Sequence, residues 1–147
     1  MLSRGEMAGE RLEVPLATQD QEDEQSCFSD NTHRDIVMDA LGIQNVWLGR
    51  YRRADGTLLQ GPSLNDLVAA ADPQQAQKTS DDIAASLSAV KAIEPPFDRE
   101  IRGDSAAPGR LRVQVAIDAL QKQAMDFVAS AGAIGITKLT IVNPKQR

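Results

Sequence analysis

The chain of 147 residues contains very few aromatic side chains: they make up 3% of the sequence, with one Trp and one Tyr. A core with so few rings must be built mainly from Ala, Leu, Ile and Val, which suits closely packed helices better than a β-sandwich. Long runs of β-branched residues, which are typical of a buried sheet, are also missing. The composition therefore favours an all-α fold with a single core.

Other absences narrow the class of protein further. A single cysteine, Cys27, cannot form a disulfide within the chain. The sequence has no run of about 18 apolar residues, so we expect no membrane span. Residues 1–16 include no apolar segment of the kind that a signal peptide requires, so we expect no secretion signal in this chain.

The net charge of −5 is distributed unevenly. Residues 1–40 hold ten acidic side chains against three arginines, which gives this part a net charge of −7. An acidic front repels phosphate and argues against nucleic acid as a partner. Cations, basic peptides or a basic protein surface fit it better. The same charges also suit a solvated acidic loop, and the sequence leaves both readings open.

Apolar residues recur at helical spacing in several stretches of the chain. Pro15 is expected to end a short helical piece at residues 2–10, because proline lacks a backbone N–H. The stronger patterns predict four helices, at residues 30–52, 64–71, 75–93 and 111–131. Polar loops are expected at residues 17–28 and 97–109, a turn at 54–57, a short extended piece at 58–61, and a strand or a poorly packed end at 136–142. This order predicts an antiparallel helical bundle with long irregular loops.

Residues 26–51 are the most informative stretch, because they include the only Cys, His, Trp and Tyr of the chain. Ser29 or Asp30 is expected to cap the helix that follows, since either side chain can accept a bond from a free N–H of the first turn. Trp47 and Tyr51 are four residues apart, so they are expected to share a helix face as a core pair or, less simply, to form a ligand platform.

Residues 22–35 read EDEQSCFSDNTHRD, a long pattern of unusual composition. Together with GEMAGERLEV before it and GPSLNDLVAA, FDREIRGDSAAPGR and VQVAIDALQKQ after it, this pattern resembles the C-terminal half of the imelysin family. The resemblance covers the chain to about residue 135. It implies an all-helical protein of two bundle-like halves, found in the periplasm or attached to the outer membrane and connected with iron acquisition.

The proposed metal or catalytic motif of that family, GxHxxE, lies in its N-terminal half and has no counterpart here, because DNTHRD around the only histidine does not fit it. No catalytic or cofactor-binding residue can therefore be carried over. The resemblance implies that residues 1–135 are an imelysin-like domain separated from its other half, followed by a divergent tail at residues 136–147. The expected partners are the missing N-terminal half or a second copy of the chain.

His33 and the acidic residues near it are the candidate metal ligands. Asp35 and Asp39 recur at helical spacing beside His33, and Asp30 lies three residues before it. Carboxylate oxygens with one imidazole would suit iron or zinc. The competing explanation is structural: Asp30 and Asp35 would complement the positive end of a helix, and His33 would bond to a loop carbonyl. Cys27 and His33 could also form a thiol nucleophile with its base, but the sequence offers no third group to orient the base.

Three functions remain open. The first is a metal- or ligand-binding module of an iron-acquisition protein, with iron or a peptide as the possible ligand. The second is a metallopeptidase fragment, although without the motif we expect this chain alone to cleave nothing. The third is a structural fragment that needs a partner. Two charged runs bear on these functions: the acidic run Glu22–Glu24 could bind a cation weakly or be solvated, and the arginines at 50, 52 and 53 are expected to pair with the acidic loop or with the missing half.

Overall fold

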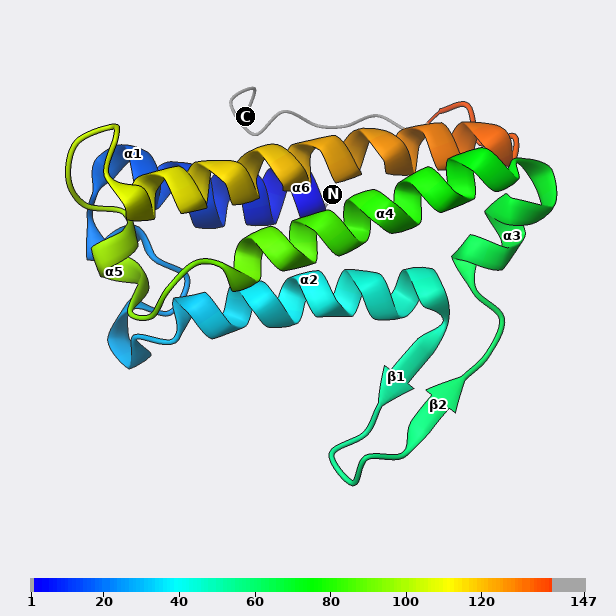
Figure 1. The fold of residues 1–147 in the computed structure, drawn as a ribbon, viewed down its shortest axis with the longest axis horizontal. Coiled ribbons are helices and arrows are strands. Elements are labelled where there is room, and N and C mark those ends of the chain that lie inside the picture. The colour runs from blue at the N-terminus through cyan, green and yellow to red at the C-terminus, as the bar shows by residue number, and fades with distance from the viewer. Residues whose placement is uncertain (1, 139–147) are drawn as a thin grey trace.

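The computed structural model describes residues 2–138, which are mostly helical and include one small β-hairpin (Figure 1). Before the first long α-helix come a π-helical segment, a short helix and two 3-10 turns, which are η1 (Leu2–Glu13), α1 (Val14–Thr18), η2 (Gln21–Asp23) and η3 (Cys27–Ser29). The remaining elements are α2 (Thr32–Leu48), β1 (Arg50–Arg52), β2 (Leu58–Gln60), α3 (Leu64–Ala71), α4 (Pro73–Lys91), α5 (Phe97–Glu100) and α6 (Pro108–Ala133).

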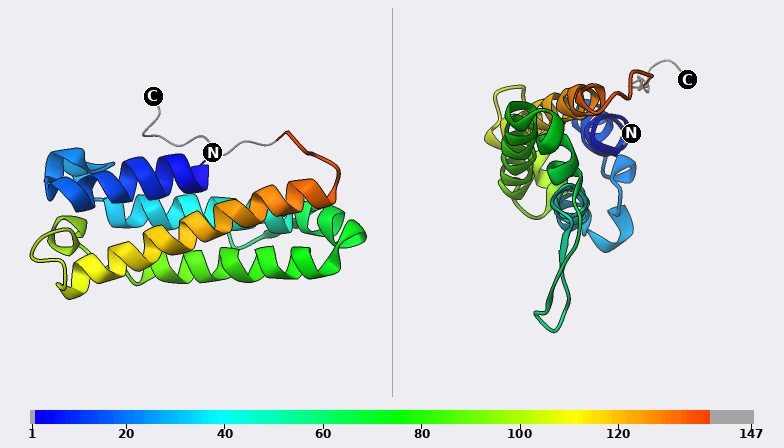
Figure 2. Two further views of the ribbon diagram at one scale, coloured as in Figure 1. Left: turned by 90° about the horizontal axis from the view of Figure 1, so that it is seen from above. Right: turned by 90° about the vertical axis from the view of Figure 1, so that its right-hand side faces the viewer.

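Four helical rods, η1, α2, α4 and α6, lie side by side and form the bundle (Figures 1 and 2). Helix α6 packs against α4 and η1, and α4 packs against α2. Each of these neighbouring pairs is antiparallel (Figure 1). The prediction of an all-α fold is therefore confirmed.

Aliphatic residues fill most of the core, as the composition predicted. The larger cluster of buried residues joins η1, α2, α4, α5 and α6 and contains one aromatic residue, Phe97. A smaller cluster surrounds Trp47, whose ring meets the edge of Phe127 with the centroids 5.9 Å apart. The Trp47 indole N–H donates to Ser80 Oγ (2.8 Å), so its one polar atom is also paired.

Helix α2 is shorter at both ends than the predicted helix at 30–52. Neither Ser29 nor Asp30 caps it: the N-cap is Asn31, without a side-chain cap bond, and Asp30 adopts a left-handed backbone (φ 50°) just before it. At the other end Gly49 takes φ 58° and ends the helix. A Cβ at this position would lie 2.7 Å from the carbonyl oxygen of Gly61, so the close approach also requires glycine.

Because α2 ends at Leu48, the predicted core pair of Trp47 and Tyr51 is wrong. Trp47 is buried, but Tyr51 lies on β1 and is 55% exposed. Strand β1 pairs with β2 in an antiparallel hairpin with Tyr51 opposite Leu59, and every residue of both strands is exposed. The predicted turn at 54–57 and extended piece at 58–61 are confirmed, with Gly56 at φ 86° supplying the turn.

Prolines caused three other differences. Pro15 does not end the first helical segment, because it lies in the first turn of α1, where a missing N–H costs nothing. For the same reason Pro73 begins α4 at residue 73, two residues before the predicted start, with Asp72 as its cap. The region 97–109, predicted to be a loop, contains α5, and α6 already starts at Pro108. Of the predicted strand or loose end at 136–142, residues 139–142 lie outside the described residues.

Candidate functional site

The candidate site is the loop of residues 19–31 together with the first turns of α2. Hydrogen bonds attach both ends of this loop to neighbouring elements. Gln19 exchanges two bonds with the backbone of Gly103, from Nε2 to the carbonyl oxygen (3.1 Å) and from the Gly103 N–H to Oε1 (3.0 Å). At the other end the Ser26 N–H donates to Thr32 Oγ1 (3.1 Å). The loop is therefore held between α2 and the α5–α6 connection.

Asp35 closes the loop onto α2. One of its carboxylate oxygens accepts from Ser26 Oγ, and the other accepts from Asn31 Nδ2 (3.1 Å). Both oxygens thus have partners from within the loop, which is the structural role that a capping acid performs near the start of a helix. A metal ion could bind Asp35 only by sharing or displacing these bonds.

Glu24 is the unusual residue of the loop. Its side chain is buried, with 5% of the residue exposed, and neither carboxylate oxygen makes a hydrogen bond of good geometry, although the Thr32 hydroxyl acts on the carboxylate as a weak donor. Burial raises the pKa of Glu24, the charges of Asp98 and Asp30 raise it further, and the Thr32 hydroxyl and Arg102 oppose the shift. A buried carboxylate without a partner costs free energy unless a proton or a cation joins it.

Two further residues of the site, one in the loop and one in α2, share this pattern of unpaired polar atoms. Nδ1 of His33 and Oε1 of Gln25 are buried and have no hydrogen-bond partner. His33 therefore is not bonded through Nδ1 to a loop carbonyl, and no residue orients its ring through that atom as a catalytic base would require. Burial also raises the pKa of Asp39, against the opposing effect of a hydrogen bond from Gln25.

The four predicted metal ligands are not brought together as a complete site. Asp30 is exposed, Asp35 is already paired, and His33 and Asp39 are half-buried. Across residues 2–138 no group of three or more His, Cys, Asp or Glu side chains is arranged so that it could hold a metal ion. A site that uses these residues would need ligands from elsewhere, and metal binding at them stays a prediction. From the sequence alone, Glu24 was named only as part of an acidic run. Its burial could not be predicted from the spacing of residues along the sequence.

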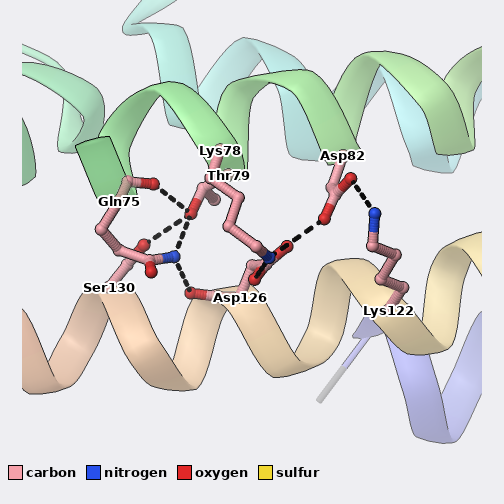
Figure 3. Close-up of polar contacts among 7 residues, drawn as sticks. All are labelled: Gln75, Lys78, Thr79, Asp82, Lys122, Asp126 and Ser130. Atoms are coloured by element: carbon pink, nitrogen blue, oxygen red, sulfur yellow. Dashed lines mark hydrogen bonds and ion pairs between the residues drawn. The ribbon is translucent and has the colours of Figure 1, made fainter. Parts of the chain in front are cut away.

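A second polar cluster, which the sequence did not predict, crosses from α4 to α6 (Figure 3). Lys78 pairs with Asp126 on α6 and with Asp82 on its own helix (3.4 Å), and Lys122 of α6 reaches back to Asp82 (2.7 Å). One turn away, the hydroxyls of Thr79 and Ser130 lie 2.8 Å apart. These contacts bridge the two helices along one side of their interface.

The two aspartates of this cluster respond to their surroundings in opposite directions. Burial raises the pKa of Asp126, and the carboxylate of Asp82 raises it further. Burial would raise the pKa of Asp82 too, but hydrogen bonds from Asp126, Lys122 and Lys78 outweigh it and lower this pKa. Since both lysines already neutralise the pair, the cluster is a structural connection between α4 and α6.

Comparison with known proteins identifies the family. The family model described as Imelysin (Peptidase_M75) matches residues 1–126. The chain belongs to the imelysin family. It is also 29% identical over 130 residues to "Iron-regulated protein A" of Synechococcus elongatus, an alignment that covers 86% of the chain but 35% of the relative's length. The chain thus spans about a third of that relative, and the predicted family is confirmed. Within residues 2–138 no helix is both long enough and apolar enough to cross a membrane.

Proposed function

We propose that this imelysin-like chain is the binding module of a protein of iron acquisition that works in the periplasm or at the outer membrane. The loop of residues 19–31 and the start of α2 supply the acidic side of a site for a metal ion, iron or zinc. Polypeptide outside this chain supplies the remaining ligands. Family membership and the iron-regulated relative support the connection with iron.

The observation that supports the proposal most is the buried, unpaired carboxylate of Glu24. Such a group destabilises the fold, so its presence requires an explanation other than packing. The unpaired Nδ1 of His33 and the raised pKa of Asp39 belong to the same loop and helix start. Because no three ligands converge in residues 2–138, this chain alone should bind a metal ion far more weakly than a complete site would.

Calorimetric titration of the chain with ferrous iron and with zinc tests the proposal. We expect weak binding whose affinity falls at least about tenfold in Glu24→Gln and in His33→Ala, because a lost ligand costs no less than a lost outer partner does. Asp81→Asn is the matched control. Asp81 is an exposed aspartate on α4 that bonds only to Gln77 among the contacts described, and its loss should leave the affinity unchanged. Titrations without heat, or heats that are equal in wild type and Glu24→Gln, would contradict the proposal.

Peptide-bond cleavage is the second candidate function, and the description of the family as a peptidase is the observation that favours it. The chain has no GxHxxE motif, so we expect no cleavage of insulin B chain by the purified polypeptide at any concentration of added zinc. Cleavage that a chelator abolishes would instead favour the peptidase. Such a result would also locate the catalytic groups within these 147 residues.

A further inference from the structure

One apolar side chain stands out from the acidic loop. Phe28, in the turn η3, is 97% exposed, so its ring has almost no contact with the rest of the chain. Exposed acids lie on both sides of it in the sequence, with Glu22 and Asp23 in the neighbouring turn η2 and Asp30 two residues later. Aromatic side chains are enriched in the cores of protein interfaces, so this bare ring with its acidic surround is a candidate anchor for a pocket of a partner.

The other end of α2 offers a pocket of matching character. A groove of about 530 Å³ lies between α2 and the β-hairpin. Its apolar wall is formed by Met38 and Leu41 of α2 and by Tyr51 and Leu58 of the hairpin, and the arginines at 50 and 52 line its edge. The hairpin itself is exposed on every residue, and an isolated two-stranded hairpin is only marginally stable in water. A partner that occupied the groove would cover both its apolar wall and the exposed hairpin.

Their positions rule out a contact between these two features within one copy, although their charges are opposite. Phe28 and the groove lie toward opposite ends of α2, a helix about 25 Å long. The hairpin arginines therefore do not pair with the acidic loop of the same chain, and the alternative expectation, that they pair with the missing half, stays a prediction. Figure 1 shows, however, that the hairpin projects from α2 on the side away from α4 and α6, and that the part of the loop directly before α2 reaches the same side at the other end of this helix. Two copies with antiparallel α2 helices would place each loop at the other's hairpin.

We propose that this face of α2 is the interface of a two-fold dimer, in which Phe28 of each copy enters the groove between α2 and the hairpin of the other. The acidic loop of one copy then faces the arginines of its partner, and the contact occurs twice about one axis. Such an interface is closed, so it gives a dimer and not a filament. The proposal concerns the outer face of α2 and does not depend on metal binding.

Sedimentation of the wild-type chain over a range of concentrations, compared with Phe28→Ser, tests the anchor. We expect a wild-type dimer whose dissociation constant rises about 30-fold in Phe28→Ser, the loss typical of a removed aromatic anchor. Because Phe28 makes almost no contacts, the fold should not suffer. Val115→Ser, which removes an exposed apolar residue of α6, is the control and should leave the dimer unchanged.

Paired charge reversals test the arrangement itself. Glu22→Lys with Asp23→Lys makes the loop basic, and Arg50→Glu with Arg52→Glu makes the hairpin acidic at the edge of the groove. Each variant alone should sediment as a monomer, because both of its contacts become repulsive. A mixture of the two should restore the dimer, because every contact in the mixed pair is again between opposite charges. A wild-type chain that stays monomeric, a dimer unaffected by Phe28→Ser, or a mixture that stays monomeric would each overturn the proposal and leave this face to a different polypeptide.

Discussion

Two buried glutamates near the same end of the bundle have opposite surroundings. Glu24 and Glu100 are each 5% exposed. Glu100 accepts two hydrogen bonds from the guanidinium of Arg112, from Nε to Oε2 (2.7 Å) and from Nη2 to Oε1 (2.6 Å), and a third from the backbone N–H of Glu94 (3.2 Å). Neither oxygen of Glu24 accepts a hydrogen bond of good geometry, and the Thr32 hydroxyl acts on this carboxylate only as a weak donor.

The pKa values follow these surroundings. Arg112 lowers the pKa of Glu100, which more than offsets the effect of its burial. Burial raises the pKa of Glu24, and nearby carboxylates add to this. Two equally buried carboxylates therefore affect stability in opposite directions. The difference arises because Glu100 has a guanidinium partner and Glu24 does not. Glu100 connects α5 to α6, whereas no comparable bond connects the carboxylate of Glu24 to another element.

The largest expected effect is the loss of the Glu100 pair. Glu100→Gln should lower the free energy of unfolding at pH 7 by about 2–3 kcal/mol, because it leaves the Arg112 guanidinium without its charged partner. The matched control is Glu94→Gln, whose exposed carboxylate lies 3.7 Å from Arg112 and should contribute less than about 0.5 kcal/mol. Urea unfolding of both variants measures the difference, and equal losses would show that Glu100 is no better paired than a surface residue.

Lowering the pH should remove the stability that the Glu100 pair contributes. Because the folded state lowers the pKa of Glu100, its contribution to stability is complete above the unfolded pKa and is lost as the pH falls through the folded pKa. The difference between wild type and Glu100→Gln should therefore shrink between about pH 5 and pH 3. Urea midpoints recorded across this range would check it, and a difference that stays constant with pH would contradict the assignment.

Glu24→Gln should have the opposite sign. The folded state raises the pKa of Glu24, so the stability linked to its protonated form is present below the unfolded pKa and is lost as the pH rises through the folded pKa. The variant should therefore be more stable than wild type by about 1 kcal/mol at pH 7 and equal to it near pH 4. A variant that is less stable at pH 7 would show that the carboxylate has a partner in the free chain.

The smallest effect is expected at Asp39, which is half-buried and has Gln25 to oppose the rise of its pKa. Asp39→Asn should raise stability at pH 7 in the same direction as Glu24→Gln, but by less than about 0.5 kcal/mol. Thermal unfolding of the two single variants and the double variant would rank them. A larger gain at Asp39 than at Glu24 would reverse the comparison.

Most of the fold could be predicted from the sequence, because periodic apolar residues mark α3, α4 and α6 and their packing follows from amphipathic faces. The errors have local physical causes. The spacing of apolar residues around Tyr51 does not reveal that Gly49 takes a left-handed backbone and ends α2. A proline in the sequence likewise does not indicate whether it ends a helix or begins one.

The candidate site was predictable only as a region. The pattern at residues 22–35 drew attention to the correct loop, and the family was confirmed from the same residues. Which carboxylate is buried and which is paired depends on how the loop folds back onto Thr32 and Asp35, contacts that spacing along the sequence does not encode. The two carboxylate oxygens of Glu24 that lack a hydrogen bond became visible only with the structure.

The most direct test is the pKa of the Glu24 carboxyl group, followed by NMR in the free chain and in the presence of zinc. The account predicts a titration above the ordinary range of glutamate in the free chain, and a fall of that pKa when zinc is added. An ordinary value for Glu24 in the free chain, or a raised value that zinc does not change, would contradict it.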